Sequence, residues 1–266
     1  MSEWLNLDGK VVVVTGGSSG IGKAVVDGLL ELNVKVANFD INPSNETHEN
    51  LFFAKTDVTS HQNVKDSVKA AVEHFGTIDG LVNNAGINIP GLLVDTQEEG
   101  GQFEVSEATF DKMTSINFKG LFFVTQEVAR VLAPKKEGVI VNMSSESGIE
   151  GSEGQSPYAA TKAAVNSLTR SWSKELAKHN IRVVGVAPGI MEETGLRTLA
   201  YESALAYTRG KTVEELRAGY SNTSAIPLGR SGKLSEVADL VAYYLSNRSS
   251  YITGITTNVS GGKTRG

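Results

Sequence analysis

The chain has 266 residues, of which 40% are hydrophobic and 21% charged, and its formal net charge is −5. This length is sufficient for one large domain with a substantial core, and the acidic balance argues against a nucleic-acid partner because no basic face dominates. The sequence has no cysteine, which excludes disulfides, thiolate catalysis and cysteine-based metal sites.

The chain starts without the apolar core of a signal peptide, and no run approaches the roughly 18 apolar residues of a membrane span. We therefore expect a cytoplasmic protein with no membrane partner. The four histidines do not cluster in the sequence and none lies in a zinc-binding pattern, so we expect no metal site.

Short β-branched runs then alternate with longer amphipathic stretches. We predict strands over residues 11–14, 34–39, 51–54, 78–82, 139–143, 181–187 and 255–259. Helices are predicted over residues 20–32, 60–75, 106–117, 121–132, 157–178 and 234–245. Strands that alternate with helices form right-handed βαβ units around a mainly parallel sheet. Since no linker or repeat interrupts the pattern, the sequence predicts an α/β fold with a single domain over residues 1–266.

A glycine-rich turn joins the first predicted strand to the first predicted helix. Gly16 permits the tight turn, while Gly20 and Gly22 let backbone and helix approach closely. The helix N-terminus then presents free N–H groups and a positive dipole end, which suit a pyrophosphate. The alternative is a plain glycine-rich loop. The candidate cofactor-binding residues here are Gly16, Ser18, Ser19, Gly20, Ile21 and Gly22.

Asp40 ends the second predicted strand. A carboxylate at this place accepts hydrogen bonds from the adenosine ribose hydroxyls and repels a 2′-phosphate. No arginine or lysine lies inside the glycine turn or directly after Asp40. The sequence therefore favours NAD over NADP, although Asp40 could also be a simple turn residue.

A phenol, an ammonium and a hydroxyl form the candidate catalytic group. Tyr158 and Lys162 are four positions apart, so they share one face of a helix. The Lys162 ammonium is expected to lower the pKa of Tyr158 from about 10 toward neutrality, which makes the phenolate a general base for an alcohol. Ser145 would orient the same alcohol oxygen. An isolated pair of this kind is more often a surface helix pair, so a catalytic interpretation of Tyr158 and Lys162 depends on the other motifs of the chain.

Taken together, these motifs resemble the short-chain dehydrogenase/reductase family over nearly the whole chain. The Thr-Gly-x-x-x-Gly-x-Gly spacing of residues 15–22 is that of the family. The resemblance extends to Asn83-Asn84-Ala85-Gly86, Asp57-Val58 and Pro188-Gly189, and to a catalytic tetrad of Asn117, Ser145, Tyr158 and Lys162.

The resemblance implies a doubly wound Rossmann fold with seven parallel strands, helices on both faces and a homotetramer. It implies hydride transfer at a nicotinamide, with Tyr158 as acid/base, Lys162 on the nicotinamide ribose, Ser145 on the substrate oxygen and Asn117 on a proton-relay water. The further cofactor-binding residues that it implies are Asp57, Val58, Asn84, Ala85, Gly86, Tyr158, Lys162, Pro188, Gly189 and Thr194.

Three departures from the family pattern affect these expectations. The short connection from Asp40 to Asp57 predicts that the usual helix between the second and third strands is missing. Residues 97–102 look inserted and are expected at the pocket rim. Glu193 occupies the position where the family often has a threonine against the nicotinamide carboxamide, and Thr194 comes next.

Residues 190–225 are expected to form a helical substrate lid. This segment is amphipathic and basic, which suits a polar, anionic substrate, although its charges could also form a solvated helix face. The lid and the C-terminal tail are most similar to those of family members that oxidise D-sorbitol 6-phosphate to D-fructose 6-phosphate with NAD. The candidate substrate residues are Ser145, Glu146, Ser147, Arg197, Arg209, Lys263 and Arg265, with the two tail residues expected to reach a neighbouring subunit's phosphate.

Two other readings stay open. One is a family member that acts on another polyol, a sugar acid or a 3-oxoacyl thioester. The other is a non-catalytic NAD-binding protein, which the complete set of Asn117, Ser145, Tyr158 and Lys162 disfavours.

Overall fold

The computed structural model describes residues 2–44, 47–192, 194–195, 197–220 and 222–264. Its centre is a seven-stranded sheet of order β3-β2-β1-β4-β5-β6-β7, in which every neighbouring pair is parallel. The strands are β1 (Val11–Thr15), β2 (Lys35–Asp40), β3 (Leu51–Lys55), β4 (Gly80–Asn83), β5 (Gly138–Met143), β6 (Ile181–Pro188) and β7 (Thr256–Val259).

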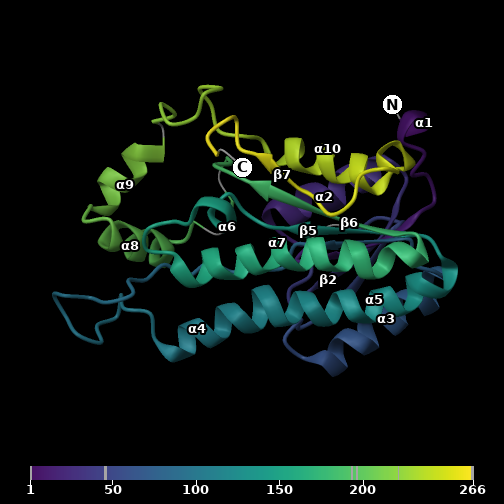
Figure 1. Ribbon diagram of the computed structural model, residues 1–266, viewed down its shortest axis with the longest axis horizontal. Helices are drawn as coiled ribbons and strands as arrows, with labels where there is room; N and C mark the ends of the chain where they lie inside the picture. The colour runs from purple at the N-terminus through teal and green to yellow at the C-terminus, as the bar shows by residue number, and fades with distance from the viewer. Residues whose placement is uncertain (1, 45–46, 193, 196, 221, 265–266) are drawn as a thin grey trace.

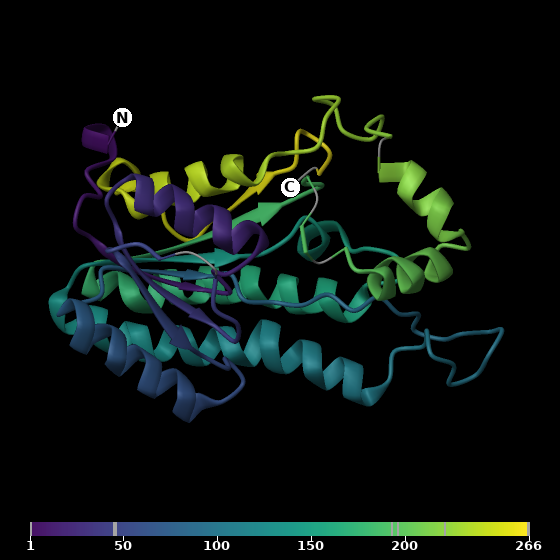
Figure 2. The same cartoon turned by 180° about the vertical axis from the view of Figure 1, so that it is seen from behind.

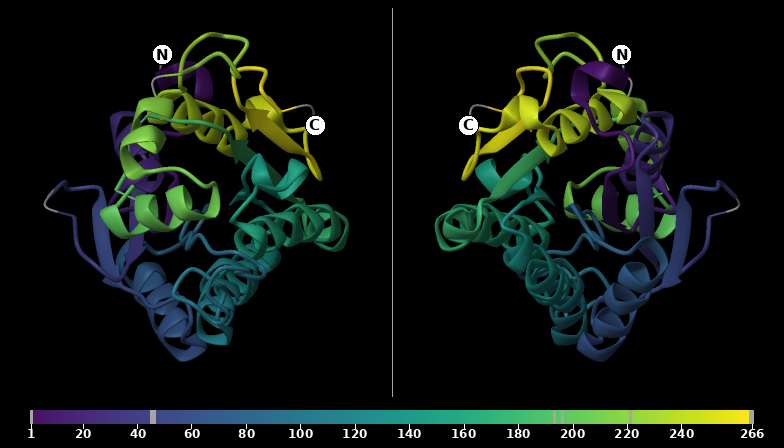
Figure 3. Two further views of the ribbon diagram at one scale, coloured as in Figure 1. Left: turned by 90° about the vertical axis from the view of Figure 1, so that its left-hand side faces the viewer. Right: turned by 90° about the vertical axis from the view of Figure 1, so that its right-hand side faces the viewer.

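Helices cover both faces of the sheet (Figures 1 and 3). α2 (Gly20–Glu31) and α10 (Leu234–Leu245) pack on one face, while α3 (His61–Phe75), α5 (Leu121–Lys135) and α7 (Ser156–Leu176) pack on the other. Alternate side chains of β1 enter the two cores: Val12 and Val14 face α2 and α10, and Val11 and Val13 face the opposite layer. This two-sided burial is why the strands are continuous apolar runs.

The remaining elements are short. They are α1 (Ser2–Leu5), α4 (Glu107–Thr114), η1 (Ser115–Gly120), α6 (Ser147–Glu150), η2 (Ala177–His179), α8 (Leu199–Thr208), α9 (Val213–Tyr220) and η3 (Asn247–Ser249). The expected seven-stranded α/β fold is confirmed, and no helix lies between β2 and β3 in the described residues 41–44 and 47–50. None of the helices in the described residues combines the length and the hydropathy that a membrane span requires.

The two helices predicted over 106–117 and 121–132 are instead one continuous rod. α4 passes through the π-helical turn η1 directly into α5. Gly120, at the end of this turn, lies against Val58, and a Cβ atom added to it would come within 2.8 Å of the Val58 Cγ2 atom. The wide turn therefore lies where the helix packs closely on the loop after β3.

The strand order reverses between β1 and β4, which leaves a crevice at the carboxyl ends of these two strands. The lid helices α8 and α9 stand beyond those ends, as Figure 2 shows from behind. They share a small core of Leu205, Ala206 and Leu216, and Arg217 of α9 pairs with Glu202 of α8 at 2.7 Å.

The long loop before α4 supports the lid. The Tyr207 hydroxyl of α8 donates to Asp95 at 2.7 Å, and the rings of Phe103 and Tyr207 stack with centroids 4.2 Å apart. None of residues 97–102 lines the crevice, so the expectation that this insertion forms the pocket rim is wrong. Asp95 and Phe103, on either side of the insertion, instead contact Tyr207 of α8.

Candidate active site

A cavity of about 920 Å³ lies between the carboxyl ends of the strands and the lid. Its size and mixed lining suit a dinucleotide together with a small substrate. Most of the predicted cofactor residues line it: Gly16, Ser19, Gly20, Ile21, Asp40, Asp57, Val58, Asn84, Ala85, Gly86, Tyr158, Lys162, Pro188, Gly189 and Thr194.

The glycine turn is fastened to the end of β4. Gly16 has φ +65°, and a Cβ atom added to Gly22 would lie 2.0 Å from the Gly16 carbonyl oxygen. The Asn84 side chain donates to the carbonyl oxygens of Thr15 at 3.1 Å and Gly16 at 3.0 Å. Gly22 therefore closes the turn from behind and does not line the cavity.

Asp40 lies at the end of β2 with its carboxylate at the cavity wall. It accepts hydrogen bonds from the backbone N–H groups of Ser18 and Asn42, both at 3.0 Å. The Ser18 hydroxyl donates to the Asn42 carbonyl oxygen at 2.6 Å, so Ser18 positions the Asp40 loop and does not face the cavity. The open glycine turn and this oriented carboxylate fit the pyrophosphate and adenosine ribose of a dinucleotide.

Tyr158 and Lys162 lie in the first two turns of α7, on one face as the spacing predicts. The Lys162 ammonium is buried, donates to the Met143 carbonyl oxygen at 2.8 Å, and lies 5.7 Å from the centre of the Tyr158 ring. Ser145 follows β5 and accepts from the Ser147 hydroxyl at 3.0 Å. The neighbouring Ser144 hydroxyl donates instead to the Lys162 carbonyl oxygen at 3.1 Å, which anchors α7.

The protonation of this pair differs from the sequence prediction. Burial raises the pKa of Tyr158 to about 12, although its hydrogen bond with Ser145 acts in the opposite direction. Burial also lowers the pKa of Lys162 to about 8. The expectation that the pKa of Tyr158 lies below its ordinary value is therefore wrong for the protein alone, and loss of water from the buried phenol is the largest cause of the shift.

Asn117 lies in the π-helical turn and behind the cavity wall. Its Oδ1 atom accepts from the Ile87 N–H at 2.8 Å, and its Nδ2 atom donates to the Ile87 carbonyl oxygen at 2.8 Å and to Thr161 at 3.2 Å. It is almost fully buried and does not line the cavity. Asn117 thus joins the loop after β4 to α7 beneath Lys162.

The predicted substrate residues Glu146, Ser147, Arg197, Arg209 and Lys263 all line the cavity, and Arg265, like Glu193, lies outside the described residues. Lys263 contacts Glu146 at 2.8 Å and Glu150 at 3.2 Å. Burial acts to lower the pKa of Lys263, but the two carboxylates outweigh it and hold the pKa above its ordinary value. Lys263 therefore lines the cavity of its own chain, and the expected contact with a neighbouring subunit stays a prediction.

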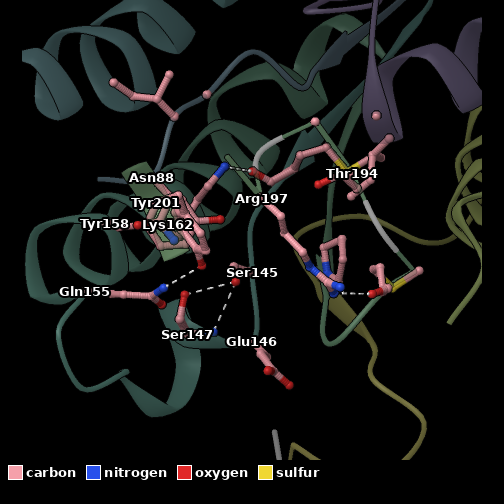
Figure 4. A pocket seen from close by; sticks show the side chains of 18 of the residues that line it. Asn88, Ser145, Glu146, Ser147, Gln155, Tyr158, Lys162, Thr194, Arg197 and Tyr201 are labelled. Carbon is pink, nitrogen blue, oxygen red and sulfur yellow. Dashed lines mark hydrogen bonds between the residues drawn. The ribbon is translucent and has the colours of Figure 1, made fainter. Parts of the chain in front are cut away.

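Sequence reasoning missed Gln155 and Tyr201. Gln155, just before α7, donates to the Tyr201 hydroxyl at 3.0 Å, and Tyr201 brings α8 beside Tyr158 (Figure 4). Tyr201, Leu205 and Arg209 recur every four positions and all line the cavity. That spacing is visible in the sequence and could have identified the inner face of the lid.

Among the described residues, no group of three histidine or acidic side chains is placed to hold a metal ion. The buried polar atoms that have no partner within the described chain include Asn88 Oδ1 and the Tyr220 hydroxyl. Both residues line the cavity, although the two unpartnered atoms themselves are buried.

Comparison with known proteins agrees with this geometry. The chain is 59% identical to sorbitol-6-phosphate 2-dehydrogenase of Klebsiella pneumoniae, over 100% of both proteins. It is 39% identical to a 3-oxoacyl-[acyl-carrier-protein] reductase of Thermotoga maritima, over 97% of this chain and 99% of that one. The crystal structure of a Brucella melitensis 3-ketoacyl-(acyl-carrier-protein) reductase complexed with NADH superposes with a TM-score of 0.82 at 27% identity, covering 97% of this chain and 100% of that chain. The family described as short chain dehydrogenase matches residues 10–204, and the chain belongs to it.

Proposed function

We propose that this protein is an oxidoreductase that interconverts D-sorbitol 6-phosphate and D-fructose 6-phosphate with NAD. The 59% identity to the Klebsiella enzyme over the full length of both chains carries the choice of substrate. The basic residues Arg197, Arg209 and Lys211 in the lining of the cavity support it, because a sugar phosphate is an anion.

The residues around the glycine turn would hold NAD. Gly16, Gly20 and the N-terminus of α2 suit the pyrophosphate, and Asp40 suits the adenosine ribose while repelling a 2′-phosphate. Asp57, Val58 and the 84–86 segment are proposed around the adenosine, with Pro188, Gly189 and Thr194 near the nicotinamide. A nicotinamide cofactor held there would supply the hydride acceptor for C2 of the substrate.

The remaining chemistry belongs to the chain. Ser145 would donate a hydrogen bond to the C2 oxygen and orient it. Tyr158 would take the C2 hydroxyl proton during oxidation and return it during reduction. Lys162 would stabilise the phenolate by charge, since its ammonium lies within 6 Å of the ring. Asn117 would act through Ile87 and Thr161, by holding the loop and helix that flank Lys162.

The test is NADH formation from NAD with sorbitol 6-phosphate and with sorbitol at equal concentrations. We expect kcat/KM to be higher for the phosphorylated substrate by about a hundredfold, which corresponds to roughly 2.8 kcal/mol. Equal rates with the two substrates would mean that the enzyme does not recognise the phosphate group. Screening of other polyols, sugar acids and ketoses would then be required.

The 39% identity to the Thermotoga reductase supports a second candidate, reduction of a 3-oxoacyl thioester. The Asp40 carboxylate would repel the 2′-phosphate of NADPH. Acetoacetyl-coenzyme A with NADH and NADPH is a direct assay. Turnover of this thioester faster than that of fructose 6-phosphate would favour the second candidate.

We propose a homotetramer in the cytoplasm. Phe110 of α4 and Phe122 of α5 are 50% and 38% exposed, and such aromatic rings on one outer helix layer suit burial against another subunit. A sugar phosphate does not cross a bilayer unaided, because charge is costly in hydrocarbon. Light scattering that gives the mass of one chain would contradict the assembly.

A further inference from the structure

Three cationic side chains of the lid line the cavity: Arg197 before α8, Arg209 at its end and Lys211 after it. Within the described residues, none of the three forms an ion pair. Other cations nearby are neutralised, since Arg217 pairs with Glu202 and Lys263 with two glutamates. Among the described cations that line the cavity, the unpaired positive charge therefore comes from the lid and not from Lys263.

Two of these cations, Arg197 and Arg209, lie near Tyr201, which in turn lies beside Tyr158. Tyr201 lies beside Tyr158 and acts to raise its pKa. Burial raises the pKa of Tyr201 itself, and the guanidinium groups of Arg209 and Arg197 lie near enough to act against that rise. Arg209 and Arg197 therefore lie on the far side of Tyr201 from the proposed acid/base Tyr158. In an extended hexitol phosphate, phosphorus lies roughly 7 Å from C2, given bond lengths of about 1.5 Å.

Tyr220 of α9 supplies an independent observation. The guanidinium carbon of Arg197 lies 4.4 Å from the centre of the Tyr220 ring, and Arg197 donates to the Met191 carbonyl oxygen at 2.8 Å. The Tyr220 hydroxyl is buried and has no hydrogen-bond partner in the described chain. A buried hydroxyl without a partner is costly, so a ligand oxygen that accepts its hydrogen would be stabilising.

We infer that Arg197, Arg209 and Tyr220 form the phosphate subsite of the substrate cavity, with Lys211 at its outer rim. This inference rests on the proposed function and specifies it. Arginine provides paired donors that match phosphate oxygens, and the Tyr220 hydroxyl adds a neutral donor. Because the phosphate-binding side chains lie at the two ends of α8 and in α9, a bound phosphate would hold the two lid helices together over the reacting carbon.

The experiment compares kcat/KM for sorbitol 6-phosphate and for sorbitol in the variants Arg209→Gln, Arg197→Gln and Tyr220→Phe. For each arginine variant, we expect the ratio of the two kcat/KM values to fall by roughly tenfold to a hundredfold, and by about threefold to tenfold for Tyr220→Phe. Because a phosphate contact is made equally in the ground and transition states, the loss appears in KM for the phosphorylated substrate more than in kcat.

Two matched controls separate phosphate binding from lid stability. The double variant Arg217→Gln/Glu202→Gln removes a lid ion pair that does not line the cavity, and Lys263→Met removes the cation that pairs with Glu146 and Glu150. Both controls should change kcat/KM for the two substrates by a common factor and leave the ratio of the two values within about twofold of wild type. Unfolding midpoints of all variants identify any that fail to fold.

The outcomes distinguish the subsite from the function. A wild-type enzyme without preference for the phosphorylated hexitol would refute the proposed substrate. A wild-type preference that survives in Arg209→Gln and Arg197→Gln would overturn the subsite and leave the function standing. A preference lost only in Lys263→Met would assign the phosphate to the tail. Inhibition by inorganic phosphate, weakened in the arginine variants, provides a readout that does not depend on sorbitol turnover.

Discussion

The ammonium of Lys263 lies 2.8 Å from the carboxylate of Glu146, although 117 positions separate them in the chain. Their side chains are only 23% and 14% exposed, so the pair is largely shielded from water. Thr264 donates a further hydrogen bond to the same carboxylate at 2.8 Å. Since Glu146 directly follows Ser145, Lys263 and Thr264 hold the loop that carries the hydroxyl proposed to orient the substrate.

Replacement of Lys263 by methionine should lower the stability of the protein. It leaves Glu146 partly buried without its cation, which costs roughly 1–3 kcal/mol. Urea denaturation measures this loss, and Lys10→Met at the more exposed pair with Glu137 is the matched control, expected to cost below about 1 kcal/mol. The double variant with Glu146→Gln should recover part of the loss, whereas strict additivity would mean that the pair is not coupled.

The variant Tyr158→Phe should retain NADH binding and lose roughly 10²–10⁴-fold or more in kcat. The phenol is the proposed proton acceptor, and the ring alone preserves the packing. Fluorescence titration with NADH and steady-state rates measure the two effects. In the wild-type enzyme, alcohol oxidation should accelerate with rising pH, because a pKa of about 12 keeps the phenol protonated at neutral pH. Wild-type turnover by the phenylalanine variant would disprove the assignment.

Lys162 should make stability depend on pH in a defined window. Its pKa is about 8 in the folded protein, against an ordinary value of 10.5. Between these values the unfolded chain binds more protons, so stability rises as the pH increases from about 8 to 10.5. The denaturation midpoint of the wild type minus that of Lys162→Met should increase across this window. A constant difference would show that the lysine is not shifted.

Replacement of Asp40 by alanine should relax the preference for NAD. The carboxylate that repels a 2′-phosphate is removed, so the ratio of kcat/KM for NAD to that for NADP should fall by roughly tenfold or more. Asp40→Asn is the closer control, because it removes the charge and keeps an acceptor for the Ser18 N–H. If both variants keep the wild-type ratio, cofactor selection lies elsewhere.

The sequence predicted the sheet and the cofactor crevice because their causes are local. Runs such as residues 11–14 are apolar throughout, and strands buried on both faces require that pattern. The glycines at 16 and 22 are needed for close backbone contacts, which is a property of the residue type itself. These features are therefore visible without coordinates.

The remaining features depend on contacts between distant segments. The pKa of Tyr158 depends on how deeply α7 and α8 bury it, and spacing along one helix does not reveal this. Lys263 and Glu146 are 117 positions apart, so their pairing depends on where the tail lies in the folded chain. The sequence does not show which cations have carboxylate partners, and in the structure Arg217 and Lys263 have them whereas Arg209 has none among the described residues.

Because of the π-helical turn at residues 115–120, the number of residues in this helix determines where Asn117 points beside the candidate active site. A π turn holds one residue more than an α turn, so deletion of a single residue here would restore regular α-helix. Because each helical residue turns the chain by about 100°, Asn117 would then rotate away from Ile87 while α4 and α5 kept their own contacts. The register of one polar side chain is thus set by a residue count, and an insertion or deletion at this point would act like a substitution of Asn117 itself.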